Sequence, residues 1–249
     1  MATTPNAENL VGQSTFIFRG TVVKTNASLV SAMPAGPNTA IVKVDQVLRA
    51  PEVLGSMTGD QVTVQFKAPT NVQVGQQRLF FTVPVVFSDT VAVQETGQLQ
   101  TTPPDVQAMS AHVDLVSNLV KQLPDKKLQE HALTADAVVT GTVTAVKPVV
   151  PPPGSPVTEH DPKWHEATLK VESVERGHVA SDTVTVLFAN SKDIAWYTSP
   201  KFTVGQKGVF VLHSAGPVMR ATTHFLATDP LDYHPTQQRE RIRSLVHSK

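Results

Sequence analysis

The chain contains one series of four short blocks twice, and this repeat constrains its fold more than any other feature of the sequence. In the first half the blocks read FIFRGTVV (16–23), AIVKVDQV (40–47), QVTVQF (61–66) and VGQQRLFF (74–81). In the second half they read AVVTGTVT (137–144), ATLKVESV (167–174), TVTVLF (183–188) and VGQKGVFV (204–211). Because the blocks keep their order about half a chain apart, the sequence predicts a tandem duplication of one small domain.

Length and composition fit two β domains. At 249 residues the chain can form two ordinary domains, which we assign to residues 10–124 and 125–249. It is 40% hydrophobic but only 6% aromatic, and Val and Thr are frequent, a mixture typical of half-buried strands. We therefore predict a mainly β fold with two tandem five-stranded OB-like β-barrels, each followed by a C-terminal α-helix.

The first unit is expected to begin after a polar, frayed start at residues 1–10. Its strands are predicted at about 14–25, 39–48, 61–67, 77–86 and 90–95. An apolar stripe from Val106 to Leu123 then predicts a helix that Asp105 caps and Pro124 ends, before a short helical turn.

The second unit repeats this pattern with longer loops. Its strands are predicted at about 137–147, 166–174, 183–188, 206–214 and 220–226. A closing helix is predicted over 235–247, with Pro235 as a favourable first residue. The loops 148–165 and 189–202 are longer than their counterparts in the first unit. Such insertions often carry binding sites, although neutral drift on a solvated surface would look the same.

A glycine in the first strand of each unit, Gly20 and Gly141, is expected where that strand bends to serve both sides of a small barrel.

Four short motifs of the second unit resemble those of a known group of barrels, and they lie at 135–143, 171–177, 184–186 and 205–211. Their order resembles the OB-fold barrels of the netrin-like and tissue-inhibitor-of-metalloproteinase-like group. The first unit departs from it at Ala50, which replaces the glycine of the Glu-Arg-Gly segment. The animal inhibitors of this group chelate the protease zinc through an N-terminal cysteine. This chain has no cysteine, so the resemblance implies a fold and no inhibitory residue.

Several classes of function lack their sequence signals. Without cysteine there can be no disulfide framework, thiol catalysis or cysteine zinc site. The sequence has no Gly-x-Ser-x-Gly nucleophile motif, phosphate-binding loop or dinucleotide fingerprint. We therefore predict that the chain is not an enzyme and needs no cofactor.

The sequence also suggests a compartment. The first ten residues have neither a basic region nor an apolar core, and no apolar run approaches the ~20 residues of a membrane span. We expect a soluble cytoplasmic protein, although a mature secreted fragment would look the same.

One polar cluster suggests a metal site. The segment 159–166 contains His160 and His165 beside carboxylates, and these residue types can ligate zinc or another divalent ion. The alternative is a proline-stiffened polar loop whose Trp164 covers the barrel edge. His213 and His224, on later strands, can complete a site only if they face this loop.

Nucleic-acid binding is a second alternative, because OB folds bind single strands with exposed aromatic residues and a basic groove. Five phenylalanines lie in strand patterns: Phe16, Phe18, Phe66, Phe80 and Phe81. Basic residues in or beside the same strands are Arg19, Lys24, Lys43 and Lys67. A zero net charge argues against a strongly electropositive surface, and the phenylalanines can equally form the core.

The leading hypothesis is a non-enzymatic protein-binding or structural scaffold module. Both long loops of the second unit carry aromatic residues, Trp164 in one and Trp196 with Tyr197 in the other, and aromatic side chains anchor interfaces. A duplicated domain also suits bivalent contact with a symmetric partner. The predicted partner is a protein, either a repetitive assembly or a second copy of the chain.

Overall fold

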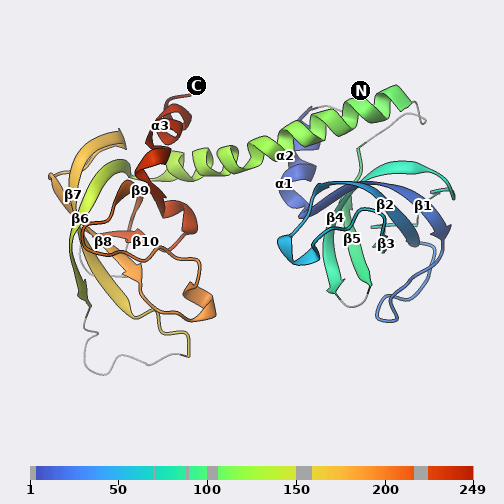
Figure 1. The fold of residues 1–249 in the computed structure, drawn as a ribbon, viewed down its shortest axis with the longest axis horizontal. Coiled ribbons are helices and arrows are strands. Elements are labelled where there is room, and N and C mark those ends of the chain that lie inside the picture. The colour runs from blue at the N-terminus through green and yellow to red at the C-terminus, as the bar shows by residue number, and fades with distance from the viewer. Residues whose placement is uncertain are drawn as a thin grey trace. The chain divides into compact units, whose positions relative to one another are not determined.

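The chain folds into two compact units, Met1–Pro124 and Asp125–Lys249. The computed structural model describes residues 4–69, 71–87, 90–99, 106–149, 159–215 and 224–248 (Figure 1). Each unit contains a closed five-stranded barrel, and a helix follows each barrel, which confirms the fold class predicted from the repeat.

The first barrel has the strand order β1-β2-β3-β5-β4 and closes through the pairing of β1 with β4. Its strands are β1 Phe16–Thr25, β2 Thr39–Arg49, β3 Gln61–Gln65, β4 Gln77–Phe87 and β5 Val91–Gly97. The short 3₁₀ turn η1, Glu52–Leu54, follows β2. Neighbouring strands are antiparallel except β3 and β5, which pair in parallel.

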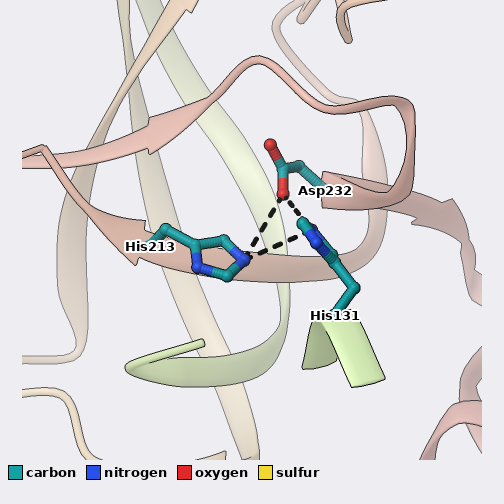
Figure 2. Close-up of side chains that lie close together, drawn as sticks. All are labelled: His131, His213 and Asp232. Atoms are coloured by element: carbon teal, nitrogen blue, oxygen red, sulfur yellow. Dashed lines mark hydrogen bonds and ion pairs between the residues drawn. The ribbon is translucent and has the colours of Figure 1, made fainter. Parts of the chain in front are cut away.

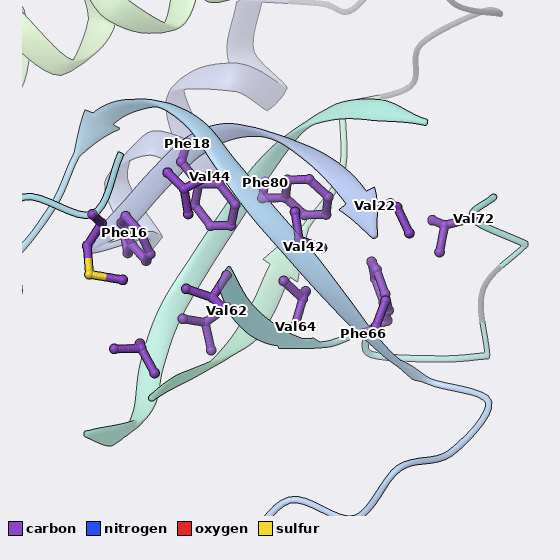
Figure 3. Packing of buried hydrophobic residues seen from close by; sticks show 14 residues of the cluster. Phe16, Phe18, Val22, Val42, Val44, Val62, Val64, Phe66, Val72 and Phe80 are labelled. Carbon is purple, nitrogen blue, oxygen red and sulfur yellow. The ribbon is translucent and has the colours of Figure 1, made fainter. Parts of the chain in front are cut away.

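Apolar side chains fill the first barrel (Figure 3). Phe18 and Phe80 stack inside it with ring centroids 5.0 Å apart. Phe16 and Phe66 are buried with them, and Phe81 is buried outside the barrel against the first helix. The core interpretation is therefore confirmed for all five phenylalanines, and none of them is exposed for stacking on a base.

The second barrel repeats the first strand by strand. Its strands are β6 Ala137–Pro148, β7 Trp164–Gly177, β8 Thr183–Ala189, β9 Lys207–Ser214 and β10 His224–Ala227. It closes where β10 pairs with β9, and β8 pairs with β10 in parallel, as β3 does with β5. A short extra strand, β11 (Tyr233–Pro235), pairs with residues 208–210 of β9, on the edge that does not face β6.

The glycines of the first strands occupy equivalent, crowded positions. Gly20 pairs with β2 on one side and β4 on the other, and Gly141 does the same with β7 and β9. A Cβ on Gly20 would lie 2.7 Å from Val42 Cγ1, and one on Gly141 would lie 2.5 Å from the Lys170 carbonyl oxygen. Only glycine lets the chain approach this closely. Each first strand pairs on both sides at its glycine, as the sequence predicted.

The prediction of a frayed start is wrong, because a helix, α1 (Thr4–Gln13), precedes β1. Its apolar residues Ala7, Leu10 and Val11 are buried in a cluster with Ile17 and Phe81. The stripe is too short to be recognised in the sequence, and packing stabilises such a short helix more than its intrinsic propensity does.

The prediction that Pro124 ends the second helix is also wrong. The helix α2 runs over Val106–Thr134 with Pro124 inside it, although the predicted cap Asp105 lies outside the described residues. An internal proline costs roughly 3 kcal/mol. Buried residues on both sides of it offset this cost, since Val116 packs in the first unit and Leu128 in the second. None of the described helices combines the length and apolar character that crossing a bilayer requires.

The same arginine contact joins the preceding helix to the second strand in both units. In the first unit Arg49 Nη1 donates to the carbonyl oxygens of Val11, at 2.9 Å, and Ser14, at 2.6 Å. In the second unit Arg176 Nη1 donates to those of Ala132, at 3.3 Å, and Ala135, at 2.7 Å. The guanidinium supplies donors to carbonyls near the helix end that have no helical partner. Its positive charge also lies near the negative, C-terminal end of the helix dipole, where a cation is stabilising. Each repeat is therefore a helix followed by five strands.

The last helix begins later than predicted. Pro235 is extended, with ψ 153°, and pairs with Gly208 at the end of β11. A 3₁₀ turn, η5 (Thr236–Gln238), follows, and α3 spans Arg239–His247. The proline ring fixes φ but also suits an extended residue, so the N1 position was not its only option.

Candidate functional site

The two insertions of the second unit pack against each other. The backbone N–H of Ser191 donates to the Pro162 carbonyl oxygen at 3.0 Å, and Trp164 meets Trp196 edge to face with ring centroids 5.7 Å apart. We call Trp164, Ile194, Trp196 and Tyr197 the insertion surface. The sequence predicted three of these residues as interface candidates but not that the two loops meet.

A 3₁₀ turn, η2 (Ile194–Trp196), holds the insertion surface in place. Asp193 caps it by accepting a hydrogen bond from the Ala195 backbone N–H at 2.8 Å, and the same oxygen lies 2.9 Å from His160 Nδ1. These two contacts hold the pKa of the Asp193 carboxyl below its usual value. The polar edge of Trp196 is also used, since its Nε1–H donates to the His160 carbonyl oxygen at 2.8 Å.

A lysine fixes the turn from its other end. Lys201 Nζ donates to the Trp196 carbonyl oxygen at 2.9 Å and also to that of Ala189. Burial lowers the pKa of the Lys201 ammonium. Both ends of the turn are therefore tied to the loops around it.

Two apolar side chains point away from this fixed turn. Ile194 is 87% exposed and Tyr197 is 77% exposed, while Trp164 and Trp196 are half-buried. Sequence reasoning missed Ile194, although a lone β-branched apolar residue beside Trp-Tyr in a loop was the available signal.

His160 and His165, the predicted metal ligands, contact different partners, and His165 lies at the start of β7 rather than in the loop. His160 contacts Asp193, and His165 Nδ1 lies 2.9 Å from the Lys163 carbonyl oxygen. In the described part of the chain, neither histidine belongs to a group of three side chains able to share a metal ion. The metal function of this loop stays a prediction.

A different group of potential ligands lies at the junction of α2 with the second barrel (Figure 2). It consists of His131 in the last turn of α2, His213 on β9 and Asp232 at the end of the 3₁₀ turn η4, Pro230–Asp232. His131 Nε2 lies 2.7 Å from Asp232 Oδ1 and 3.2 Å from His213 Nε2. His213 Nε2 lies 3.8 Å from the same carboxylate oxygen.

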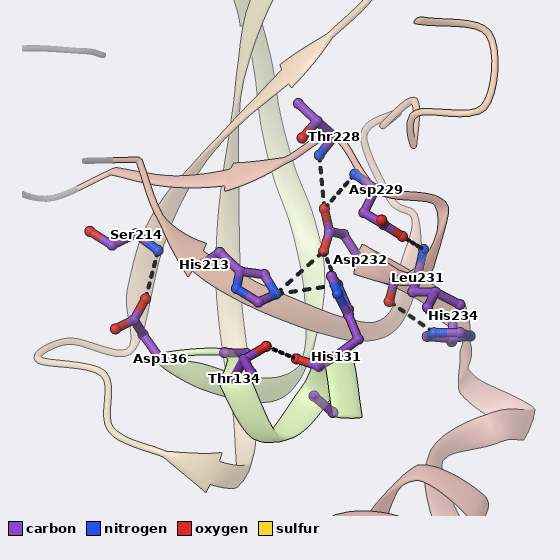
Figure 4. A network of polar contacts seen from close by, with 12 residues as sticks. His131, Thr134, Asp136, His213, Ser214, Thr228, Asp229, Leu231, Asp232 and His234 are labelled. Carbon is purple, nitrogen blue, oxygen red and sulfur yellow. Dashed lines mark hydrogen bonds and ion pairs between the residues drawn. The ribbon is translucent and has the colours of Figure 1, made fainter. Parts of the chain in front are cut away.

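Backbone donors orient the carboxylate of this group (Figure 4). Asp232 Oδ2 accepts hydrogen bonds from the backbone N–H groups of Thr228 and Asp229, each at 2.8 Å, which leaves Oδ1 facing the histidines. The Asp232 side chain is only 3% exposed. Burial, and next the nearby His131, lower the pKa of His213.

Sequence reasoning did not predict this group. The sequence predicts only a short helical turn after Pro124, where α2 in fact continues through His131, and it offers His213 only as a partner for the 159–166 loop. The side chain of His224, the other residue considered, lies outside the described part. No protein-family model matches the chain, and no characterised protein is significantly similar to it. The two candidate sites of this chain are therefore the insertion surface and the group of His131, His213 and Asp232.

Proposed function

We propose that the chain is a non-enzymatic protein-binding module that contacts its partner through the insertion surface. The observation that carries the proposal is the pair Ile194 and Tyr197, both more than three-quarters exposed on a turn fixed at both ends. Exposed aromatic and aliphatic side chains beside a half-buried tryptophan are typical of interface anchors.

The fixed backbone favours binding because little conformational entropy remains to be lost on association. The cap at Asp193 and the contacts of Lys201 are made within the chain, so those two charges are already engaged. The partner that suits this surface is a protein with an apolar groove that receives Ile194 and Tyr197.

Only the second unit carries these insertions, so the proposal assigns one contact surface to each chain. If the partner is a repetitive assembly, each chain would bind it through one surface. If the chain self-associates, two chains would bind each other through their second units. Nucleic-acid binding is the weaker candidate, because the five phenylalanines considered for base stacking are buried.

The test compares two variants of the full chain. Ile194→Asp/Tyr197→Ala removes the proposed anchors, and Val53→Asp is the matched control, since Val53 is 78% exposed in the 3₁₀ turn η1 of the first unit. We expect a partner captured from source lysate to be retained by Val53→Asp and lost by the double variant. Sedimentation velocity of the purified chain would detect self-association in the same way. Equal capture and equal sedimentation by both variants would refute the insertion surface as the contact.

A further inference from the structure

We propose that His131, His213 and Asp232 form a binding site for a divalent transition-metal ion, with Zn²⁺ as the first choice. All three residues belong to the second unit, and each presents one ligand atom to the others. Two imidazoles and a carboxylate are a ligand set that zinc uses in proteins.

The separations of the three atoms fit a metal ion. They are 2.7, 3.2 and 3.8 Å. Atoms at these separations share a point about 2 Å from each of them, which matches the Zn–N and Zn–O distances of about 2.0–2.2 Å. An ion could thus be bound without rearrangement of the backbone.

The hydrogen-bonding alternative satisfies the group less well. A neutral imidazole has one N–H, so His131 Nε2 can aim a proton at Asp232 Oδ1 or at His213 Nε2, but not squarely at both. If instead His213 donates to His131, the lone pair of His131 Nε2 faces a carboxylate oxygen. A cation at the shared point attracts all three lone pairs at once.

The surroundings also suit a bound ion. Both N–H donors to Oδ2 are backbone groups, which fixes the carboxylate as hydrogen bonds commonly do for metal ligands. The side chains of His131 and His213 are 19% and 28% exposed, so neither histidine is sealed off from solvent. Three protein ligands leave a fourth position for water or for a donor from another molecule.

The first unit has the same junction without the two histidines. His131 lies three residues before the end of α2, and Leu10 lies three residues before the end of α1. His213 follows Leu212, the β9 partner of Ala137, and Val83 follows Thr82, the β4 partner of Phe16. Leu10 is buried in an apolar cluster. Since an apolar junction supports the first barrel, the two histidines at the second junction indicate a separate purpose.

The test is metal titration of the full chain after treatment with a chelator. Zn²⁺ binding is measured by calorimetry, and Co²⁺ binding by the visible d–d absorption of a tetrahedral site. The variant His213→Val introduces the residue of the first unit and leaves the contact between His131 and Asp232 intact. The control is His160→Val, which removes a histidine from the 159–166 loop.

We expect one ion per chain for the unaltered protein and for His160→Val. For His213→Val we expect affinity to fall at least about 100-fold, more than the 10- to 100-fold typical of losing a group that only orients a ligand. Unchanged far-ultraviolet circular dichroism would show that the variant is folded. If it is not, His213→Gln replaces it and must lose affinity equally.

Three results would overturn the proposal. The unaltered chain could bind neither ion, or the His213 variants could bind as tightly as the unaltered chain. Loss of binding in His160→Val alone would assign the ion to the loop instead.

Discussion

In the first unit the junction between the helix and the barrel is apolar, and Leu10 packs there with Ile17 and Phe81. In the second unit the equivalent junction carries His131 and His213, facing the buried carboxylate of Asp232. The arginine contact between helix and second strand is nevertheless the same in both. The comparison shows that the backbone contact of the arginine is the same in both units while some side chains at the junction differ in polarity.

A second position shows the same exchange. The first unit has a half-buried Leu48 in its apolar cluster, where the second unit has a buried Glu175. The Glu175 carboxylate accepts hydrogen bonds from Thr140 at 2.9 Å, Ser173 at 2.7 Å and Arg239 at 2.8 Å. A network of charge and hydroxyl groups thus replaces apolar packing, and it ties α3 to the second barrel.

The two units can be followed separately in one sample. The chain has two tryptophans, Trp164 and Trp196, and two tyrosines, Tyr197 and Tyr233, all in the second unit. Intrinsic fluorescence therefore reports the second unit, whereas circular dichroism reports both.

The largest expected difference between the units concerns the residue after the contacting arginine, which is Gly177 in the second unit and Ala50 in the first. Gly177 has φ +77°, and a Cβ there would lie 2.0 Å from the Asp136 carbonyl oxygen, whereas the first unit has Ala50. We expect Gly177→Ala to destabilise the second unit by about 3 kcal/mol or more, through strain and overpacking. Ala50→Gly should cost the first unit only about 1 kcal/mol. Urea unfolding followed by fluorescence and circular dichroism measures both, and similar small effects would contradict the proposed difference in backbone conformation.

Loss of the arginine contact should affect the units equally. Arg49→Ala and Arg176→Ala each remove two charge-assisted hydrogen bonds to carbonyl oxygens. We expect each to lower the free energy of unfolding of its own unit by about 2 kcal/mol. Only Arg176→Ala should shift the fluorescence transition. A much smaller effect in one unit would mean that the contact is not equivalent in the two.

At the position of Leu48 and Glu175, the contribution to stability should depend on pH only in the second unit, because only that unit has a carboxyl there. Burial raises the pKa of Glu175, but the hydrogen bonds from Ser173, Arg239 and Thr140 outweigh it and leave the pKa below its usual value. A carboxyl with a lowered folded-state pKa stabilises the fold at higher pH, and this stability is lost as the pH falls below about 4.3. We expect Glu175→Gln to cost about 1–2 kcal/mol at pH 7 and less at pH 3. A cost that does not change with pH would show that the carboxylate charge is not what stabilises this network.

The smallest effect is expected at a turn that the repeat keeps unchanged. Val74 and Val204 are each 66% exposed, just before Gly75 and Gly205, whose φ values are +84° and +87°. Val74→Ser and Val204→Ser should each change stability by less than about 0.5 kcal/mol. Thermal unfolding would detect a larger loss in either one, which would indicate an unrecognised contact at that turn.

The sequence predicted the barrels well because their blocks of Val and Thr occur twice, so each copy supports the other. It failed at the helices, where the outcome depends on distant packing. α1 depends on Ile17 and Phe81, and α2 continues through Pro124 because of residues buried on each side.

The candidate sites were only partly predictable for a related reason. Aromatic residues in two long loops indicated a surface, but the contact of Trp164 with Trp196 joins segments far apart in the chain. His131 and Asp232 are separated by 101 residues and meet only because α2 ends beside the barrel. The resemblance to netrin-like barrels stays a prediction.

The arginine contact also determines where this protein can be divided. A fragment that starts at β1 would lose both carbonyl acceptors of Arg49 and expose Ile17 and Phe81 to water. A fragment of the second unit that starts at β6 would leave Arg176 in the same position, without Ala132 and Ala135. The duplicated unit is therefore longer than the barrel, and its first element is the helix that precedes the barrel.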